Sequence, residues 1–219
     1  GLHSYAISAI DLALWDLKGK ILDRPVYELL GGPARNELFC YSTGGDTDWY
    51  MELGFLATKL PCPYGPADGI DGLQKNIELI ARTREEVGPK VELMLDCWMA
   101  FDVEYAVRLA EELRPYKLKW MEEMLRSEDF DAHAQLRQRI PWQTLATGEH
   151  WYGTVPFQHA ASRHLAMERV VFRCFHANVV IAVRVAMMLV LGAECARDDF
   201  QCAVLAIRVV YRDPHRRAS

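Results

Sequence analysis

The run VELMLD at residues 91–96 is a short apolar segment that ends on a carboxylate, and two similar runs follow it. These are LKWME at residues 118–122 and TLATG at residues 144–148, which Glu149 follows directly. Asp96, Glu122 and Glu149 lie 26 and 27 residues apart, room for one helix, one strand and two loops. Such a repeat returns the chain to the same rim of a parallel sheet, where (β/α) barrels form their active sites.

The segments around these runs extend the same pattern. Apolar runs at residues 38–42 and 55–60 precede them, and amphipathic stretches occupy residues 72–87, 103–114 and 130–139. Short apolar runs that alternate with helical stretches predict an α/β fold with a parallel sheet. Five such strands are more than half of a TIM barrel, so we expect a partial TIM (β/α) barrel.

The chain divides into three parts on composition and pattern. Residues 1–36 hold an amphipathic helix at 8–20 and a short helix between Pro25 and Gly31, separate from the partial barrel at 37–162. From residue 163 the basic residues are nine arginines and no lysine. We therefore expect 163–219 to be a divergent or frame-shifted tail, in which residues 167–174 could add a sixth strand.

Composition limits the class of protein. The chain has 219 residues, 51% of them hydrophobic, and a net charge of −5 without a basic stripe, which disfavours nucleic acid as a partner. Six cysteines without a CxxC pair favour reduced thiols in a cytoplasm, and no signal peptide is recognised. The apolar run at 179–191 is too short for a membrane span and contains Arg184, so we expect no membrane partner.

Three carboxylates at one rim predict a metal site. Without a counter-charge they would repel one another, whereas a hard divalent cation prefers such oxygen ligands. Because no Cys or His stands at ligand spacing, Asp96, Glu122 and Glu149 favour Mg²⁺ over zinc. The alternative is that these acids cap helices or face solvent.

Four separated motifs resemble one known family. They are SAIDLALWD at residues 8–16, LMLDCWM at 93–99, LKWMEE at 118–123 and TGEH at 147–150. In this order they are similar to the mandelate-racemase branch of the enolase superfamily, and within it to the L-rhamnonate dehydratases. Two further segments, at residues 54–61 and 64–69, favour that group, and the resemblance covers about residues 1–162.

The resemblance implies a fold and a reaction. The fold is an enolase-type barrel preceded by the last helices of a capping domain. The reaction is a Mg²⁺-dependent dehydration of a sugar acid: a base takes the proton α to the carboxylate, and the 3-hydroxyl leaves to give a 2-keto-3-deoxy acid. It further implies a small-molecule substrate and, as in many members, a homo-oligomer.

His150 and Lys59 are the catalytic candidates. His150 follows a presumed ligand, where it could orient substrate or help an oxygen leave, and the alternative is a hydrogen-bonded loop histidine. Lys59 stands where racemases of this branch carry Lys-x-Lys, but Ala57 breaks that pair. This favours elimination over a racemase or cycloisomerase, with Lys59 contacting substrate or acting electrostatically.

The family's base, a histidine on the seventh strand, has no counterpart in a matching motif. His176 is the nearest candidate, yet neither its spacing nor its neighbours match, so it is not assigned the role. The other histidines are expected on the surface or in loops: His3, His133, His159, His164 and His215. A catalytically inactive fragment of such a dehydratase therefore stays open as an alternative.

Overall fold

The computed structural model describes residues 2–32, 39–153, 155–162 and 170–172. These residues fall into two compact units, 2–32 and 39–172, and each is described by itself. No helix among these residues has the length and apolar character needed to cross a bilayer.

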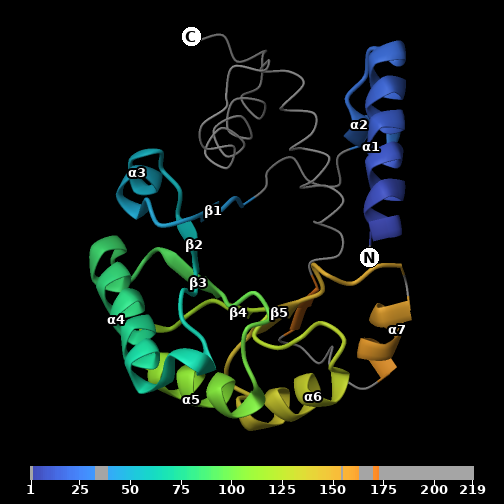
Figure 1. Ribbon diagram of the computed structural model, residues 1–219. Coiled ribbons are helices and arrows are strands. Elements are labelled where there is room, and N and C mark those ends of the chain that lie inside the picture. The colour runs from blue at the N-terminus through green and yellow to red at the C-terminus, as the bar shows by residue number, and fades with distance from the viewer. Residues whose placement is uncertain (1, 33–38, 154, 163–169, 173–219) are drawn as a thin grey trace. The chain divides into compact units, whose positions relative to one another are not determined.

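The second unit is built on one parallel sheet (Figure 1). Its six strands stand in sequence order, and every neighbouring pair is parallel. All strands therefore point their carboxyl ends to the same edge. The strands are β1 (Ser42–Thr43), β2 (Ala57–Pro61), β3 (Glu92–Asp96), β4 (Met121–Glu122), β5 (Leu145–Thr147) and β6 (Val170–Phe172).

Helices connect the strands and cover the outer side of the sheet, where α4, α5 and α6 follow one another in Figure 1. This βα alternation confirms the α/β prediction. The helices are α3 (Thr47–Glu52), α4 (Gly69–Val87), α5 (Val103–Leu113), α6 (Phe130–Arg139) and α7 (Val155–Ser162), with short 3₁₀ turns η1 (Pro66–Asp68) and η2 (Arg114–Tyr116).

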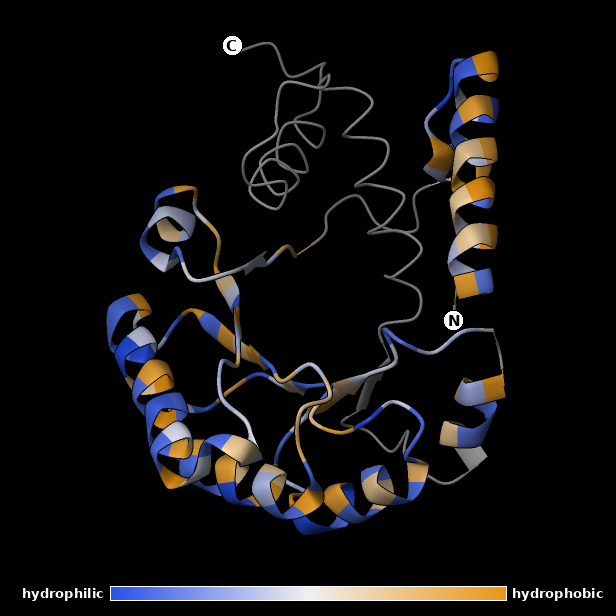
Figure 2. Ribbon diagram, viewed as in Figure 1, coloured by the Kyte–Doolittle hydropathy of each residue, from blue (hydrophilic) through white to orange (hydrophobic). Residues whose placement is uncertain are grey.

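The apolar faces of α4, α5 and α6 pack on the sheet to form the main core. Figure 2 shows apolar and polar residues alternating along these helices, as expected where one face is buried. In α5, Asp102 caps the first turn by accepting a hydrogen bond from the Tyr105 amide at 2.8 Å. The fully buried members of this core include Ile80, Leu93, Leu95, Leu109, Met121 and Ile140.

Most element boundaries agree with the sequence pattern. Helix α6 matches the predicted range 130–139, and β3 lies inside 91–96. Strand β4 is only two residues long. The Lys119 amide nevertheless donates a hydrogen bond to the Leu93 carbonyl at 2.8 Å, so the predicted strand at 118–122 lies alongside β3 over more than those two residues. Strand β6 lies within the predicted run 167–174, and the rest of the predicted tail, 163–169 and 173–219, lies outside the described residues.

The first unit is a long helix and a short one. Helix α1 spans Leu2–Leu22 and α2 spans Val26–Leu29. Gly19 is buried, and a Cβ there would lie 2.9 Å from the Arg24 carbonyl oxygen. The absence of a side chain at Gly19 therefore permits the close turn between the helices. The predicted apolar face of α1 is exposed, with Ile10, Leu14 and Leu17 at 63%, 59% and 51%.

Candidate functional site

Two of the predicted carboxylates end adjacent strands. Asp96 is the last residue of β3 and Glu122 the last of β4, and the two residues are paired in the strand register. Because the strands are parallel, both side chains stand at the carboxyl edge of the sheet. This is where the sequence spacing predicted them.

Lys59 of β2 links these two carboxylates. Its Nζ lies 2.7 Å from Asp96 Oδ2 and 3.0 Å from Glu122 Oε1. The Lys59 side chain is 4% exposed and that of Glu122 is fully buried. The single charge of the ammonium therefore partly offsets two negative charges in a region of low dielectric, where an unpaired charge would be costly. We call Lys59, Asp96 and Glu122 the lysine-linked cluster.

The other oxygens of the cluster also have donors. Trp120 donates its indole Nε1–H to Glu122 Oε2 at 3.0 Å, and the Trp98 amide donates to Asp96 Oδ1 at 3.2 Å. Trp98 has φ of +43°, and its side chain is 73% exposed. Both carboxylates are thus held at both oxygens by contacts within the chain.

Glu123 forms a second pair with His150. The two carboxylate oxygens lie 3.0 and 2.9 Å from His150 Nδ1, and Glu123 is 2% exposed. Burial raises the pKa of Glu123, the hydrogen bond to His150 lowers it, and the negative charges of Glu149 and Asp96 raise it further. The left-handed φ of +46° at Glu123 ends the strand alternation at Glu122. The only sequence signal for the pair was the Glu-Glu doublet.

Glu149 lies in an exposed turn after β5. Gly148 starts this turn with φ of +107°, and a Cβ there would lie 3.3 Å from the Trp151 and Phe157 rings. Over the residues with described positions, no three Asp, Glu, His or Cys side chains are arranged as a formed metal site. The prediction that Asp96, Glu122 and Glu149 bind one cation therefore stays a prediction.

The donor set suits a hard cation rather than a soft one. Asp96 and Glu122 supply carboxylate oxygens from fixed positions, and a cationic group already lies between them. The nearest cysteine along the chain, Cys97, is 1% exposed, and burial raises the pKa of its thiol well above the usual range. A neutral thiol is a poor metal ligand, so the chemistry favours oxygen ligation.

Two of the remaining histidines fall in the described second unit. His133, expected at the surface or in a loop, is instead 7% exposed inside α6, and its Nε2 contacts the Arg126 carbonyl at 3.1 Å. That expectation was wrong because residues 130–139 turn one face to the core and His133 falls on it. His159 of α7 is exposed. His164, His176 and His215 lie outside the described residues.

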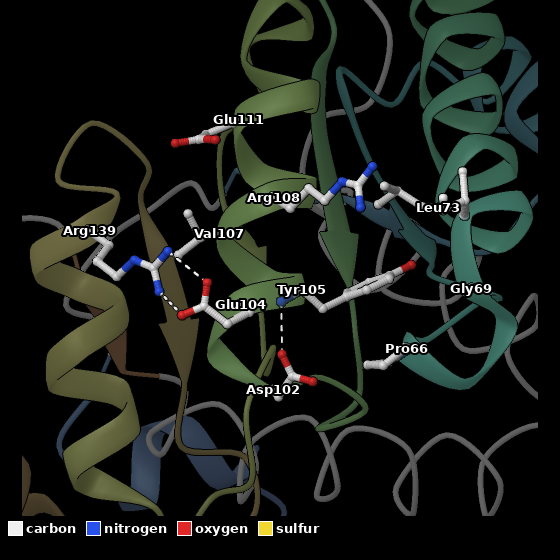
Figure 3. A pocket seen from close by; sticks show the side chains of 11 residues that line it. Pro66, Gly69, Leu73, Asp102, Glu104, Tyr105, Val107, Arg108, Glu111 and Arg139 are labelled. Carbon is white, nitrogen blue, oxygen red and sulfur yellow. Dashed lines mark hydrogen bonds and ion pairs between the residues drawn. The ribbon is translucent and has the colours of Figure 1, made fainter.

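A separate hollow lies on the outer surface of the second unit (Figure 3). Its volume is about 470 Å³. Arg139 reaches across to Glu104 with two hydrogen bonds, and both side chains are largely exposed. None of the predicted site residues lines it. Its walls come from η1, α4, α5 and α6, and include Ile70, Leu73, Tyr105, Arg108 and Glu111.

Two family models match the chain. Residues 48–171 match the model described as enolase C-terminal domain-like, more than half of the chain. The chain belongs to the enolase superfamily. Residues 2–31 match the N-terminal domain model of mandelate racemase and muconate lactonizing enzyme, so the predicted branch is confirmed.

Similar proteins of this superfamily carry related activities. L-rhamnonate dehydratase of Saccharopolyspora erythraea is 55% identical over 151 residues, covering 68% of this chain and 39% of that protein. The structure of rhamnonate dehydratase from Gibberella zeae with Mg is 37% identical, with a TM-score of 0.70 over 75% of this chain and 41% of that one. A racemase from Streptomyces coelicolor with bound magnesium is 30% identical, with a TM-score of 0.66 over 75% and 47%.

These comparisons confirm the enolase-type fold and Mg²⁺ as a metal of this superfamily. The chain spans about 40% of the length of the dehydratases it matches. A partial barrel agrees with that coverage, since six parallel strands are present among the described residues.

Proposed function

We propose that this chain carries the metal-binding part of a Mg²⁺-dependent dehydratase of a sugar acid related to L-rhamnonate. The observation that carries the proposal is the pair of fixed carboxylates, Asp96 and Glu122, at the carboxyl edge of the sheet. Its likeness to L-rhamnonate dehydratases supports the reaction class.

In this proposal Asp96 and Glu122 hold the cation, and Glu149 joins them from the turn after β5. Bound there, Mg²⁺ would stabilise the negative charge that develops on a substrate carboxylate when the α-proton leaves. Lys59 would then give up contacts with one or both carboxylates, since its ammonium and the cation need the same oxygens.

The two basic residues have separate tasks. Lys59 is the cationic partner of the two carboxylates, and the positive charge of its ammonium would favour an anionic substrate at this edge of the sheet. His150 is half-buried, with its side chain 23% exposed, so its ring remains accessible to a ligand. We assign it contact with a hydroxyl group of the sugar acid.

Two measurements on the chain test the proposal. Calorimetry should detect Mg²⁺ binding that Glu122→Gln weakens at least tenfold, while Glu128→Gln, an exposed acid in the following loop, leaves it unchanged. With Mg²⁺ and L-rhamnonate, a semicarbazide assay should then detect a 2-keto product.

The other outcomes separate the alternatives. Exchange of the α-proton without a keto product would favour a racemase and refute dehydration. Mg²⁺ binding with neither exchange nor product would support the inactive fragment that the sequence left open.

A further inference from the structure

The Glu123–His150 pair is built differently from the lysine-linked cluster. Both oxygens of one buried carboxylate lie within 3.0 Å of a single ring nitrogen, Nδ1. The residues come from the ends of β4 and β5, so the contact joins two strand ends at the same edge as Asp96 and Glu122.

The backbone of Glu123 is fixed on both sides. Its amide donates to the Ala146 carbonyl at 2.9 Å, and its carbonyl accepts from the Met99 amide at 2.5 Å. Its φ of +46° lies in the left-handed region, which residues other than glycine adopt only where the surroundings hold them there. The carboxylate is therefore presented to His150 from a rigid support.

The chemistry of the contact determines which ring nitrogen carries the proton. An ionised carboxylate has no proton to donate, so the nitrogen that faces it must be the donor. In neutral imidazole the other nitrogen then has a lone pair and accepts. We infer that Glu123 is a positioning residue, which holds His150 with its proton on Nδ1 and leaves Nε2 as the acceptor nitrogen.

This arrangement matters for a ligand that carries hydroxyl groups. An Nε2 lone pair can accept a hydrogen bond from a hydroxyl, whereas an Nε2–H can only donate one. The use of this acceptor by a sugar acid rests on the proposed function. The position of the proton does not, because it follows from a contact within the chain.

Nitrogen NMR can test the inference directly. The 219-residue chain, with ¹⁵N-labelled histidine, would be followed as the pH is raised until the His150 ring carries a single proton. His150 is assigned by the signals lost in His150→Gln. We expect Nδ1 to carry a directly bonded proton and Nε2 to show the shift of an unprotonated ring nitrogen.

Two variants separate positioning from a general structural role. In Glu123→Gln the side-chain amide can either donate to or accept from Nδ1, so we expect the Nδ1 proton signal to weaken and the Nε2–H form to appear. Glu128→Gln, with an exposed carboxylate, should leave the His150 signals unchanged.

The wild-type spectrum alone can overturn the inference. A singly protonated His150 ring with its proton on Nε2 is incompatible with it, as is a Glu123→Gln spectrum identical to wild type. None of these outcomes depends on turnover. A chain that shows the expected spectrum but neither binds Mg²⁺ nor dehydrates L-rhamnonate would refute the proposed function and leave the role of Glu123 standing.

Discussion

Replacing Lys59 by Met should strongly destabilise the chain in the absence of metal. The substitution keeps an unbranched side chain but removes the ammonium that contacts Asp96 and Glu122 at 2.7 and 3.0 Å. Because Lys59 and Glu122 are almost fully buried, water cannot replace the lost partner. Leaving a buried ion pair without one member costs about 3–5 kcal/mol.

The assay is urea unfolding for the free energy and thermal unfolding for the melting temperature, both monitored by circular dichroism with a chelator present. For a chain of this size the expected loss corresponds to a melting temperature lower by about 6–20 °C. Lys119→Met is the matched control, because Lys119 also pairs with a carboxylate, Glu92 at 2.9 Å, but both side chains are at least 40% exposed. An exposed pair is worth about 0.2–1 kcal/mol.

Two results would refute this reasoning. The first is a Lys59→Met variant whose free energy of unfolding lies within about 1 kcal/mol of Lys119→Met, since burial would then not decide the effect. The second concerns the double variant Lys59→Met/Glu122→Gln, which removes one of the two charges left unpaired. It should recover part of the loss, and simple additivity would show that the two residues do not interact.

Three further predictions concern other parts of the second unit. Burial lowers the pKa of His133, although the Arg126 carbonyl and Asp129 act in the opposite direction. As the pH falls, the imidazole is therefore protonated in the unfolded chain before it is protonated in the folded chain, which favours unfolding. Urea titrations should show the free energy of unfolding falling below about pH 6.5 more steeply in wild type than in His133→Gln. Cys97, with its buried thiol and raised pKa, should be alkylated by iodoacetamide more slowly than Cys62 or Cys40. Mass spectrometry of the native chain measures the order of reaction, and Cys97 reacting first would contradict this prediction. Gly148→Ala should lower the free energy of unfolding by about 1–3 kcal/mol, and by more than Gly153→Ala does. Both glycines have positive φ, but only a Cβ at position 148 would lie 3.3 Å from Trp151 and Phe157. Equal losses in urea unfolding would mean that this packing is unimportant.

The sequence predicted the fold well where the pattern repeats. The apolar run at residues 91–96 predicted β3, and the amphipathic run at 130–139 predicted α6. Both predictions hold because a parallel sheet buries its strands and is covered by helices. Helix α3 was not predicted, since six residues at Thr47–Glu52 are too few to show a helical period. Helix α7 was also missed, as its eight residues follow an aromatic turn without a clear apolar face.

The candidate site was predictable in its residue types but not in its pairing. Strand-end spacing brought Asp96 and Glu122 to one edge, as the register of β3 and β4 confirms. The contact of Lys59 with both acids depends on the reach of a long side chain across two strands, which spacing along the chain does not encode. The left-handed φ at Glu123, which sends its carboxylate to His150, likewise depends on backbone hydrogen bonds to Met99 and Ala146.

Adjacent acids at the end of β4 therefore have different chemical environments. Glu122 is paired with an ammonium and accepts a hydrogen bond from a tryptophan N–H, whereas Glu123 contacts an imidazole ring nitrogen. A conservative change to glutamine should have distinct effects. At position 122 it removes a proposed metal ligand and one of the two negative charges that contact Lys59, whereas at position 123 it should change the proton position on His150. One strand end thus presents two consecutive carboxylates to different partners, because the backbone at Glu123 is left-handed.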